Sequence, residues 1–513
     1  MEVAGALGRG SLSTYREAVG AAVRARSRVF WIVAGLTVAA AALRFATLGV
    51  QSYHHDEIVT ASRVLRDGFW HAMEAVGFSE SAPPLYYVLA WLWTQALGTG
   101  ELGLRSVSAL AGVATVPVAY LLGAELSSRR AGIVAAALVA VNPMLLWYSQ
   151  EARAYSLFVL LTALSLLYFV RALDRGRRRD FIAWGVASAL ALATHYFAAF
   201  PIAAEAIWLL RRRGREAAPG IGIIAAAGLL LAPLAIHQMS SGHAEWIGGR
   251  TLGHRLWETG LTFMLGETGD IIARPEHPLL ALVPFLLVVV ALTRVFARGD
   301  RRGRRAAGIP LAIGAVAVLV PVALGLLAPG KDYVLARNLM PALVPLLVAV
   351  AVGFTLRNAR RGGAILAAAL VAYSLGFSIW AGISPALQRP DWNSVAAALG
   401  EPRVPRAMVT WTLGKASLRY YLSTGSIQVQ PSDGFRWWVG EVDFISDGPA
   451  PPPPRRLLGP GFRQVGYQQV GRLYLRRYAT PGPGLRPLRL GIVRAAELGF
   501  RTNGVLLDGI SPP

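Results

Sequence analysis

Cysteine is absent from the 513 residues, so the chain can form no disulfide, thiolate metal site or thiol nucleophile. Charged residues are also scarce: they make up 16% of the chain, whereas 54% is hydrophobic and the mean hydropathy is positive. Apolar stretches of about 18 to 20 residues recur along the sequence. This combination is typical of a polytopic α-helical membrane protein.

Lysine is nearly absent as well, since Lys331 and Lys415 are the only two among 51 basic residues. The net charge of +22 would suit a nucleic-acid partner, but the arginines cluster between apolar runs. Charge in such places indicates membrane topology, so we expect no nucleic-acid binding. The excess of arginine, alanine and glycine suggests a high-GC bacterium, and hence a location in the bacterial plasma membrane.

Eleven apolar segments are expected to cross the membrane. They are 29–48, 104–122, 131–147, 155–170, 181–193, 198–210, 221–236, 279–295, 309–327, 339–356 and 364–383. A further apolar segment, 85–97, is too short to cross a hydrocarbon core of roughly 30 Å. If it does not cross, all six arginine clusters fall on one side of the membrane, as the positive-inside rule requires. We therefore expect 85–97 to be a helix at the outer surface.

This topology predicts three regions. Residues 1–28 form a cytoplasmic segment, and 29–384 form a membrane domain with long outer loops at 49–103 and 237–278. Residues 385–513 form an extracytoplasmic α/β domain. In this last region "RPDWNSVAAALG" predicts a short helix capped by Asp391, "RAMVTW" and "GSIQVQ" predict strands, and "GYQQVGRLYLRRY" predicts a hairpin.

Ionisable residues gather on the outer side of this topology. In "QSYHHDEIVTAS" the helical period of the apolar residues predicts a helix over 57–76, with Asp56 as N-cap and Glu57 in its first turn. Asp56 can cap this helix and also take part in chemistry. Glu80 precedes two prolines that favour a helix start. Glu151 and Arg153 begin a membrane helix, where ionisable residues are usually functional or paired.

Several of these segments together resemble the GT-C type of membrane glycosyltransferase, closest to the protein O-mannosyltransferase and aminoarabinose-transferase superfamily (glycosyltransferase family 39). The segments are "HHDE", "E-x-x-PPLYYVL", "NPMLLWYSQEARAYSL", "THYF", "ARNLMPALVPLL" and "RPDW". The resemblance implies a mannosyltransferase-like hexosyl- or pentosyltransferase at the outer face of the membrane. Its donor would be a polyprenyl-phosphate sugar, and its acceptor a lipid, a glycan or a protein.

In that family an acid in the first outer loop is essential, and Asp56 and Glu57 match it, which makes them the catalytic candidates. Glu80 matches the acid of the next loop, although its spacing to the prolines differs from the commonest form. The chemistry agrees with this assignment, because a carboxylate can take the proton of an acceptor hydroxyl and arginines suit a phosphate. By analogy we expect Asp56 to be the base of an inverting transfer. The candidates for substrate binding are Glu80, Glu151, Arg153, His195, Tyr196, Lys331, Arg337 and His55.

Three alternatives stay open. A divalent metal could bind the nitrogen and oxygen groups of His54, His55, Asp56, Glu57, Glu80 and Glu151, although no cofactor is predicted to be required. A transporter or flippase of lipid-linked envelope intermediates could use the outer acids as ion sites. It is disfavoured because the charged residues lie at helix ends and no inverted repeat is visible. A non-catalytic scaffold could stack sugars on Trp437 and Trp438, for which core or edge packing is the simpler interpretation.

Overall fold

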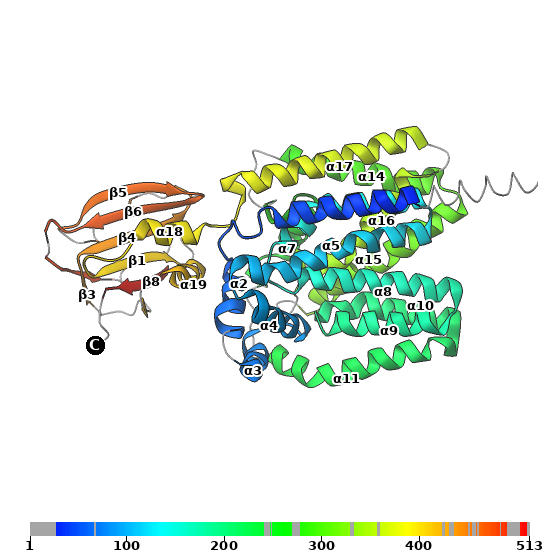
Figure 1. The fold of residues 1–513 in the computed structure, drawn as a ribbon, viewed down its shortest axis with the longest axis horizontal. Helices are drawn as coiled ribbons and strands as arrows, with labels where there is room; N and C mark the ends of the chain where they lie inside the picture. Colours follow the sequence, from blue (N-terminus) through cyan, green and yellow to red (C-terminus); the bar gives the residue numbers. More distant parts are fainter. Residues whose placement is uncertain are drawn as a thin grey trace, which may run out of the picture.

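The computed structural model divides the chain into a helical bundle and a small sheet domain at one end of it (Figure 1). We call this end of the bundle the domain end, and the opposite end the far end. The structure describes residues 27–65, 68–240, 247, 249–268, 278–328, 333–356, 360–422, 426–429, 436–449, 452–453, 458, 461–482, 484–489 and 503–509. The predicted class is confirmed: the chain is a polytopic helical membrane protein with a small α/β region near its C-terminus.

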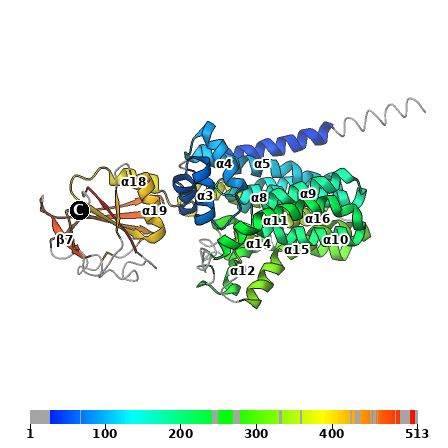
Figure 2. The ribbon, with the colours of Figure 1, turned by 90° about the horizontal axis from the view of Figure 1, so that it is seen from below.

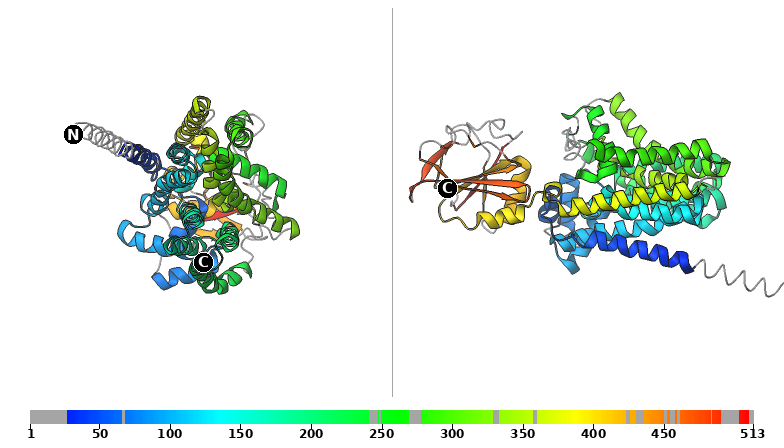
Figure 3. Two further views of the ribbon diagram at one scale, coloured as in Figure 1. Left: turned by 90° about the vertical axis from the view of Figure 1, so that its right-hand side faces the viewer. Right: turned by 90° about the horizontal axis from the view of Figure 1, so that it is seen from above.

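The bundle consists of a first helix, Ser27–Phe45, and twelve labelled helices. These are α5 (Glu101–Leu126), α6 (Arg129–Val141), α7 (Pro143–Ser149), α8 (Tyr155–Arg175), α9 (Arg178–Leu192), α10 (Ala199–Arg213), α11 (Ala218–Ser240), α12 (Leu252–Leu265), α14 (Pro278–Arg298), α15 (Arg301–Leu327), α16 (Leu343–Phe354) and α17 (Arg360–Ile383). Short 3-10 helices connect some of them: η2 (Tyr196–Ala198), η3 (Gly214–Ala217), η5 (Gly266–Thr268) and η6 (Ala336–Ala342). The first helix begins at the far end of the bundle (Figure 3).

Within the described ranges, eight helices are long and apolar enough to span a membrane, or nine if the bent pair α6–α7 counts as one span. Every segment predicted to span is helical over most of its length in the structure. Two differences in counting explain why nine spans, with α6–α7 taken as one, stand against the eleven predicted. Helix α9 has only 15 residues, and α10 and α11 count as a single stretch of 45 residues although η3 separates them. The figure of eleven spans stays a prediction.

The bend between α6 and α7 measures 56° and follows from Pro143. Proline has no N–H, so the carbonyl of Val139 loses its helical donor. The buried guanidinium of Arg44 replaces it, with Nη2 donating to the Val139 oxygen (3.3 Å) and Nη1 to the Ala140 oxygen (2.9 Å). The Asn142 carboxamide then caps α7 by accepting from the N–H of Leu145. The bend directs the loop that carries Glu151 and Arg153 towards the domain end.

The single helix predicted over 57–76 is wrong. The structure has α2 (His55–Val59), a π-helical turn η1 (Thr60–Val64) and a separate helix α3 (Phe69–Ser79). A π-helical turn adds a residue to the helical repeat, so a regular apolar period cannot follow the chain through it. The expected N-cap is also wrong: His54 is the N-cap of α2, and the Glu57 carboxylate accepts from its backbone N–H at 2.8 Å. The Asp56 side chain is therefore not occupied in capping.

Helix α4 (Leu85–Leu97) follows Pro83 and Pro84 as predicted, and it is not among the helices able to span a membrane. It lies with α2 and α3 at the domain end (Figure 1). The indole N–H of Trp93 donates to the Ser106 hydroxyl of α5 at 2.7 Å. The loop after the first helix thus covers one end of the bundle.

The sheet domain has six strands in the order β2-β8-β1-β4-β6-β5 and a separate pair, β3 with β7. Among the described strands of the larger sheet, β1 and β4 pair in parallel and the other neighbours pair antiparallel. The elements are α18 (Trp392–Leu399), β1 (Arg406–Trp411), α19 (Thr412–Tyr421), β2 (Ile427–Val429), β3 (Arg436–Val439), β4 (Glu441–Asp447), β5 (Arg463–Val470), β6 (Leu473–Ala479), β7 (Arg486–Arg489) and β8 (Asn503–Asp508). The predicted helix with its Asp391 cap, the strands and the hairpin are all present. Helices α18 and α19 lie on the side of the sheet nearer the bundle (Figure 2).

The sheet domain contacts the loop in front of Asp56. Tyr421 of α19 accepts a hydrogen bond from the backbone N–H of Tyr53 and donates one to Glu101, each at 2.6 Å. The Ser52 hydroxyl donates to Asp391 at 2.9 Å. The backbone just before α2 is therefore held from the bundle side and from the domain side at once.

Candidate active site

Four carboxylates pair with four arginines at the domain end of the bundle. The pairs are Asp56–Arg337, Glu80–Arg153, Glu57–Arg105 and Glu151–Arg389. They come from α2, from the segment before α4, from the loop between α7 and α8, from α5, from η6 and from the segment after α17. The fold therefore brings together residues that are more than 300 positions apart in the sequence.

Asp56 and Arg337 form the accessible pair. Their Oδ2 and Nη1 atoms lie 3.2 Å apart, and the two side chains are 26% and 25% exposed. In each of the other three pairs the carboxylate is no more than 6% exposed. Burial by itself would raise the pKa of Asp56, but the guanidinium groups of Arg337 and Arg153 outweigh it and hold that pKa well below the ordinary value. Of the four pairs, this one is the most exposed to solvent.

Arg153 is held beside Asp56 by Glu80. Its two terminal nitrogens donate to the two oxygens of Glu80 at 3.1 and 2.8 Å, in the bidentate geometry that favours a fixed orientation. Tyr87 donates to the same carboxylate at 2.7 Å, and Arg153 also donates to the Thr60 hydroxyl at 3.1 Å. Glu80 thus fixes a positive charge next to α2.

Glu57 is fully buried and saturated with donors. Arg105 donates to both carboxylate oxygens at 2.7 and 2.9 Å, and the N–H groups of Ala152 and His54 add two more bonds at 2.8 Å. Burial would raise the pKa of Glu57, but Arg105 and Arg389 lower it further than burial raises it, so the carboxylate is ionised. Arg105 also donates to backbone carbonyls between residues 48 and 52. This pair ties the loop before Asp56 to α5.

Glu151 meets Arg389, which follows the last helix of the bundle. The Arg389 guanidinium donates to Glu151 at 2.9 Å and to the Gln150 carbonyl at 2.7 Å, and it lies 4.6 Å from the centre of the Trp147 ring. Burial raises the pKa of Glu151, and the neighbouring Glu57 raises it as well, while Arg389 opposes them. Arg389 therefore links the loop after α7 to the start of the sheet domain.

Aromatic rings surround the accessible pair. The Arg337 guanidinium lies 5.9 Å from the centre of the Tyr155 ring, which contacts Tyr148 edge-on. The His195 ring stacks on Phe158 with centroids 4.5 Å apart. Burial, followed by the charges of Arg337 and Arg153, lowers the pKa of His195 to about 3, so this imidazole is neutral at pH 7.

Residues 81–237 match the family described as dolichyl-phosphate-mannose-protein mannosyltransferase. This match covers less than half of the chain. The resemblance to the protein O-mannosyltransferase family seen in the sequence is confirmed over this segment. No curated protein sequence matches the chain.

Two solved structures are similar to this chain. One is the archaeal oligosaccharyltransferase AglB from Archaeoglobus fulgidus, in complex with an inhibitory peptide and a dolichol-phosphate, with 12% identity and a TM-score of 0.46. The match covers 74% of the present chain, which spans 58% of the length of that enzyme. The other is ArnT from Cupriavidus metallidurans bound to undecaprenyl phosphate, with 13% identity, a TM-score of 0.38 and coverage of 88% and 98%.

The remaining predicted site residues take different places. His55 lies in α2 next to Asp56. The Tyr196 hydroxyl donates to Gln238 of α11 at 2.8 Å, so this side chain joins two helices. Lys331 lies outside the residues that the structure describes. Of the two described arginines beside Asp56, Arg337 has a more exposed side chain than Arg153.

In the part of the chain that the structure describes, the candidate metal ligands do not converge on one point. Across the described ranges no three side chains of His, Cys, Asp or Glu come together as a metal site requires. Each acid of the cluster is instead neutralised by an arginine. We therefore assign no reaction step to a metal.

Several buried charged residues escaped the sequence analysis, among them Arg105, Arg389 and Glu205. Arg105 and Arg389 join the cluster, and the only signal for Arg389 was its position in "RPDW". Glu205 lies within α10, where one of its oxygens accepts from the Ser165 hydroxyl (2.6 Å) and the Trp184 indole (2.8 Å). The expectation that charged residues avoid the middle of the spans is therefore wrong at this position.

Proposed function

We propose that this protein transfers a sugar from a polyprenyl-phosphate donor to an acceptor hydroxyl, with Asp56 as general base. The observation that carries the proposal is the accessible pair of Asp56 and Arg337. A base and a cation suited to phosphate stand within 3.2 Å of each other, at the end of the bundle that the sheet domain covers. The family match over residues 81–237 supports a lipid-linked donor. Under the proposal this end faces the outside of a bacterial plasma membrane, and the N-terminus lies in the cytoplasm.

The step is a single displacement at the anomeric carbon of the sugar. The acceptor oxygen forms a bond to that carbon while its proton passes to the Asp56 carboxylate. The bond between the carbon and the phosphate oxygen breaks, and its electron pair leaves with the polyprenyl phosphate. Arg337 stabilises the charge that develops on the phosphate. One displacement inverts the anomeric configuration and needs no second carboxylate as nucleophile.

The other acids have positioning roles in this proposal. Glu57 is fully buried and its oxygens are filled by four donors, so it orients α2 rather than meeting substrate. Glu80 orients Arg153, whose positive charge strengthens the site for an anionic donor. Glu151 and Arg389 fix the loop that contains Arg153 against the start of the sheet domain. Lys331 is a further candidate cation for the phosphate.

Donor binding would also activate the base. In the free protein Arg337 stabilises the Asp56 carboxylate and makes it a weak proton acceptor. A donor phosphate that binds Arg337 compensates its positive charge and so raises the pKa of Asp56. The base gains strength only when the phosphate to be released is in place. Asp56 would therefore take the acceptor proton readily only after the donor has bound.

The test is a donor-consumption assay with purified protein, run separately with radiolabelled polyprenyl-phosphate mannose, arabinose and glucose, and with membrane extract as acceptor. The proposal predicts that one donor is converted to free polyprenyl phosphate and a glycoside of inverted configuration. A transporter would leave every donor chemically intact. The variant Glu205→Gln separates the two further, because a transporter that uses this intramembrane acid would lose function and a transferase would keep its turnover.

A further inference from the structure

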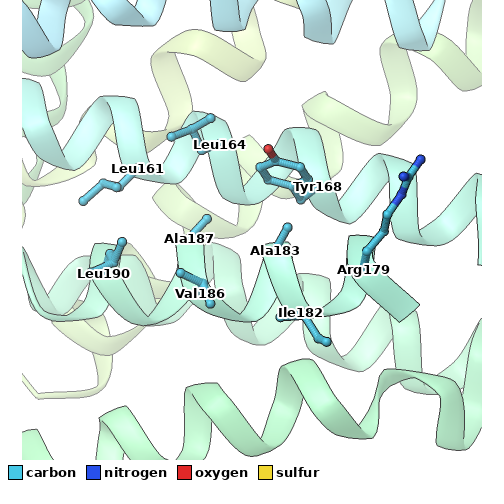
Figure 4. A pocket seen from close by; sticks show the side chains of 9 residues that line it. All are labelled: Leu161, Leu164, Tyr168, Arg179, Ile182, Ala183, Val186, Ala187 and Leu190. Atoms are coloured by element: carbon cyan, nitrogen blue, oxygen red, sulfur yellow. The ribbon is translucent and has the colours of Figure 1, made fainter. Parts of the chain in front are cut away.

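A groove of about 440 Å³ lies between α8 and α9, on the outside of the bundle. Its walls are aliphatic along most of its length, and the α9 side chains of Ile182, Val186 and Leu190 are each more than a third exposed. Arg179 and Tyr168 lie at one end of the groove, and Leu190 lies at the other (Figure 4). In a membrane this surface faces lipid.

The length of the groove fits one leaflet. Arg179 and Leu190 are 11 positions apart on one helix, which corresponds to about 16 Å at 1.5 Å per residue. One leaflet contributes about half of a hydrocarbon core of roughly 30 Å. Arg179 marks the far end of the bundle, because α9 begins at Arg178 and ends near His195 in the candidate site. The groove therefore belongs to the leaflet opposite the candidate site.

The charge of Arg179 is not compensated by any residue that the structure describes. Arg179 is exposed, and among the described residues no carboxylate or other acceptor lies within hydrogen-bonding distance of its guanidinium. It stands in the first turn of α9, where free backbone N–H groups favour an anion and the N-cap Arg177 supplies no side-chain acceptor. Asp180, the acid of that turn, is buried. Arg171 adds a positive charge over the Tyr168 ring, although it pairs with Glu125.

We propose that this groove is a binding site for an anionic phospholipid of the leaflet at the far end, with one acyl chain between α8 and α9 and the phosphate at Arg179. The aliphatic walls match the chain, and the exposed guanidinium matches a headgroup with a net negative charge. A zwitterionic headgroup fits less well, because its own ammonium group compensates the phosphate. The site is separate from the proposed transferase centre and does not depend on it.

The experiment measures lipid retention by native mass spectrometry on the full-length protein in detergent, after addition of phosphatidylglycerol or phosphatidylcholine of the same acyl chains. Wild type should retain phosphatidylglycerol about fivefold better, since one arginine near an anionic headgroup contributes about that factor. Arg179→Gln should abolish the preference. Ala183→Leu, which narrows the groove, should reduce retention of both lipids. Arg178→Gln is the matched control, because this exposed neighbour does not line the groove, and it should behave as wild type.

Two results would overturn the proposal. The first is an equal preference for phosphatidylglycerol in wild type and Arg179→Gln. The second is a wild-type dimer that Ala183→Leu converts to monomer, since the groove would then hold a helix of a second copy. Donor consumption should be unchanged in all three variants, so the outcome for the lipid site is independent of the outcome for the transferase.

Discussion

Replacing Arg337 by glutamine should raise the pKa of Asp56 and leave the rest of the site in place. With the paired atoms 3.2 Å apart, the charges are centred about 4 Å apart, which corresponds to about 4 kcal/mol at an effective dielectric constant near 20. That is about three pKa units at 1.36 kcal/mol per unit. Because both side chains are about a quarter exposed, solvent screens part of this interaction. We expect a rise of about one to two units.

The assay follows the labelling of Asp56 by a carbodiimide, which reacts with the protonated carboxyl group, as a function of pH by mass spectrometry. Wild type should label at Asp56 only at the acidic end of the range, whereas Arg337→Gln should label at distinctly higher pH. Arg337→Lys keeps the charge and should resemble wild type. Asp174, exposed at the far end, serves as the internal control for reagent activity. Identical labelling midpoints in wild type and Arg337→Gln would refute the electrostatic argument. Polyprenyl phosphate added to wild type should raise the midpoint in the same direction.

Three further predictions concern the groups around this pair. Arg105→Leu should destabilise the protein by about 3 to 5 kcal/mol in thermal unfolding, because it leaves the buried Glu57 carboxylate without its counter-charge. The double variant Glu57→Leu/Arg105→Leu should recover part of the lost stability. Equal stability of the single variant and wild type would contradict this prediction. Tyr421→Phe leaves the Tyr53 N–H without its acceptor and should speed hydrogen exchange at residues 51–54, at a cost of about 1 to 3 kcal/mol. Tyr420→Phe, which keeps the ring contact with Tyr53, is its control, and the same exchange rate in both variants would oppose the prediction. His195 has its pKa lowered from 6.5 to about 3, so the unfolded state takes up a proton first, and stability should fall as pH drops from about 6.5 towards 3. His195→Phe should flatten this part of the stability curve, and an unchanged curve would argue against a buried neutral imidazole.

Much of the fold follows from patterns that the chain carries locally. Long apolar runs and arginine clusters identify the membrane helices, and alternation identifies the strands of the sheet domain. The single helix predicted over 57–76 is an exception, because the structure divides this segment into α2, η1 and α3. A π-helical turn changes the helical period for reasons of packing, and neither composition nor spacing reveals it.

The candidate site was predictable in part. Adjacent acids after the first membrane helix, and an acid and arginine at the start of another, indicate functional chemistry. Which acid is exposed depends on residues far away in the sequence. Glu57 is fully buried against Arg105, whereas Asp56 beside Arg337 stays partly exposed. Such pairings are set by the packing of α5, η6 and the segment after α17. A local motif contains no information about them.

The most direct test of the account compares donor consumption by wild type, Asp56→Asn and Asp174→Asn at equal abundance in the membrane. Asparagine keeps the shape of the side chain but cannot accept the acceptor proton as a base. The account predicts that Asp56→Asn loses turnover by a factor of at least about 100, the lower range for a general base, while Asp174→Asn, the same change at the far end, turns over donor as wild type does. Turnover in Asp56→Asn at the wild-type rate would contradict the assignment of Asp56 as the base.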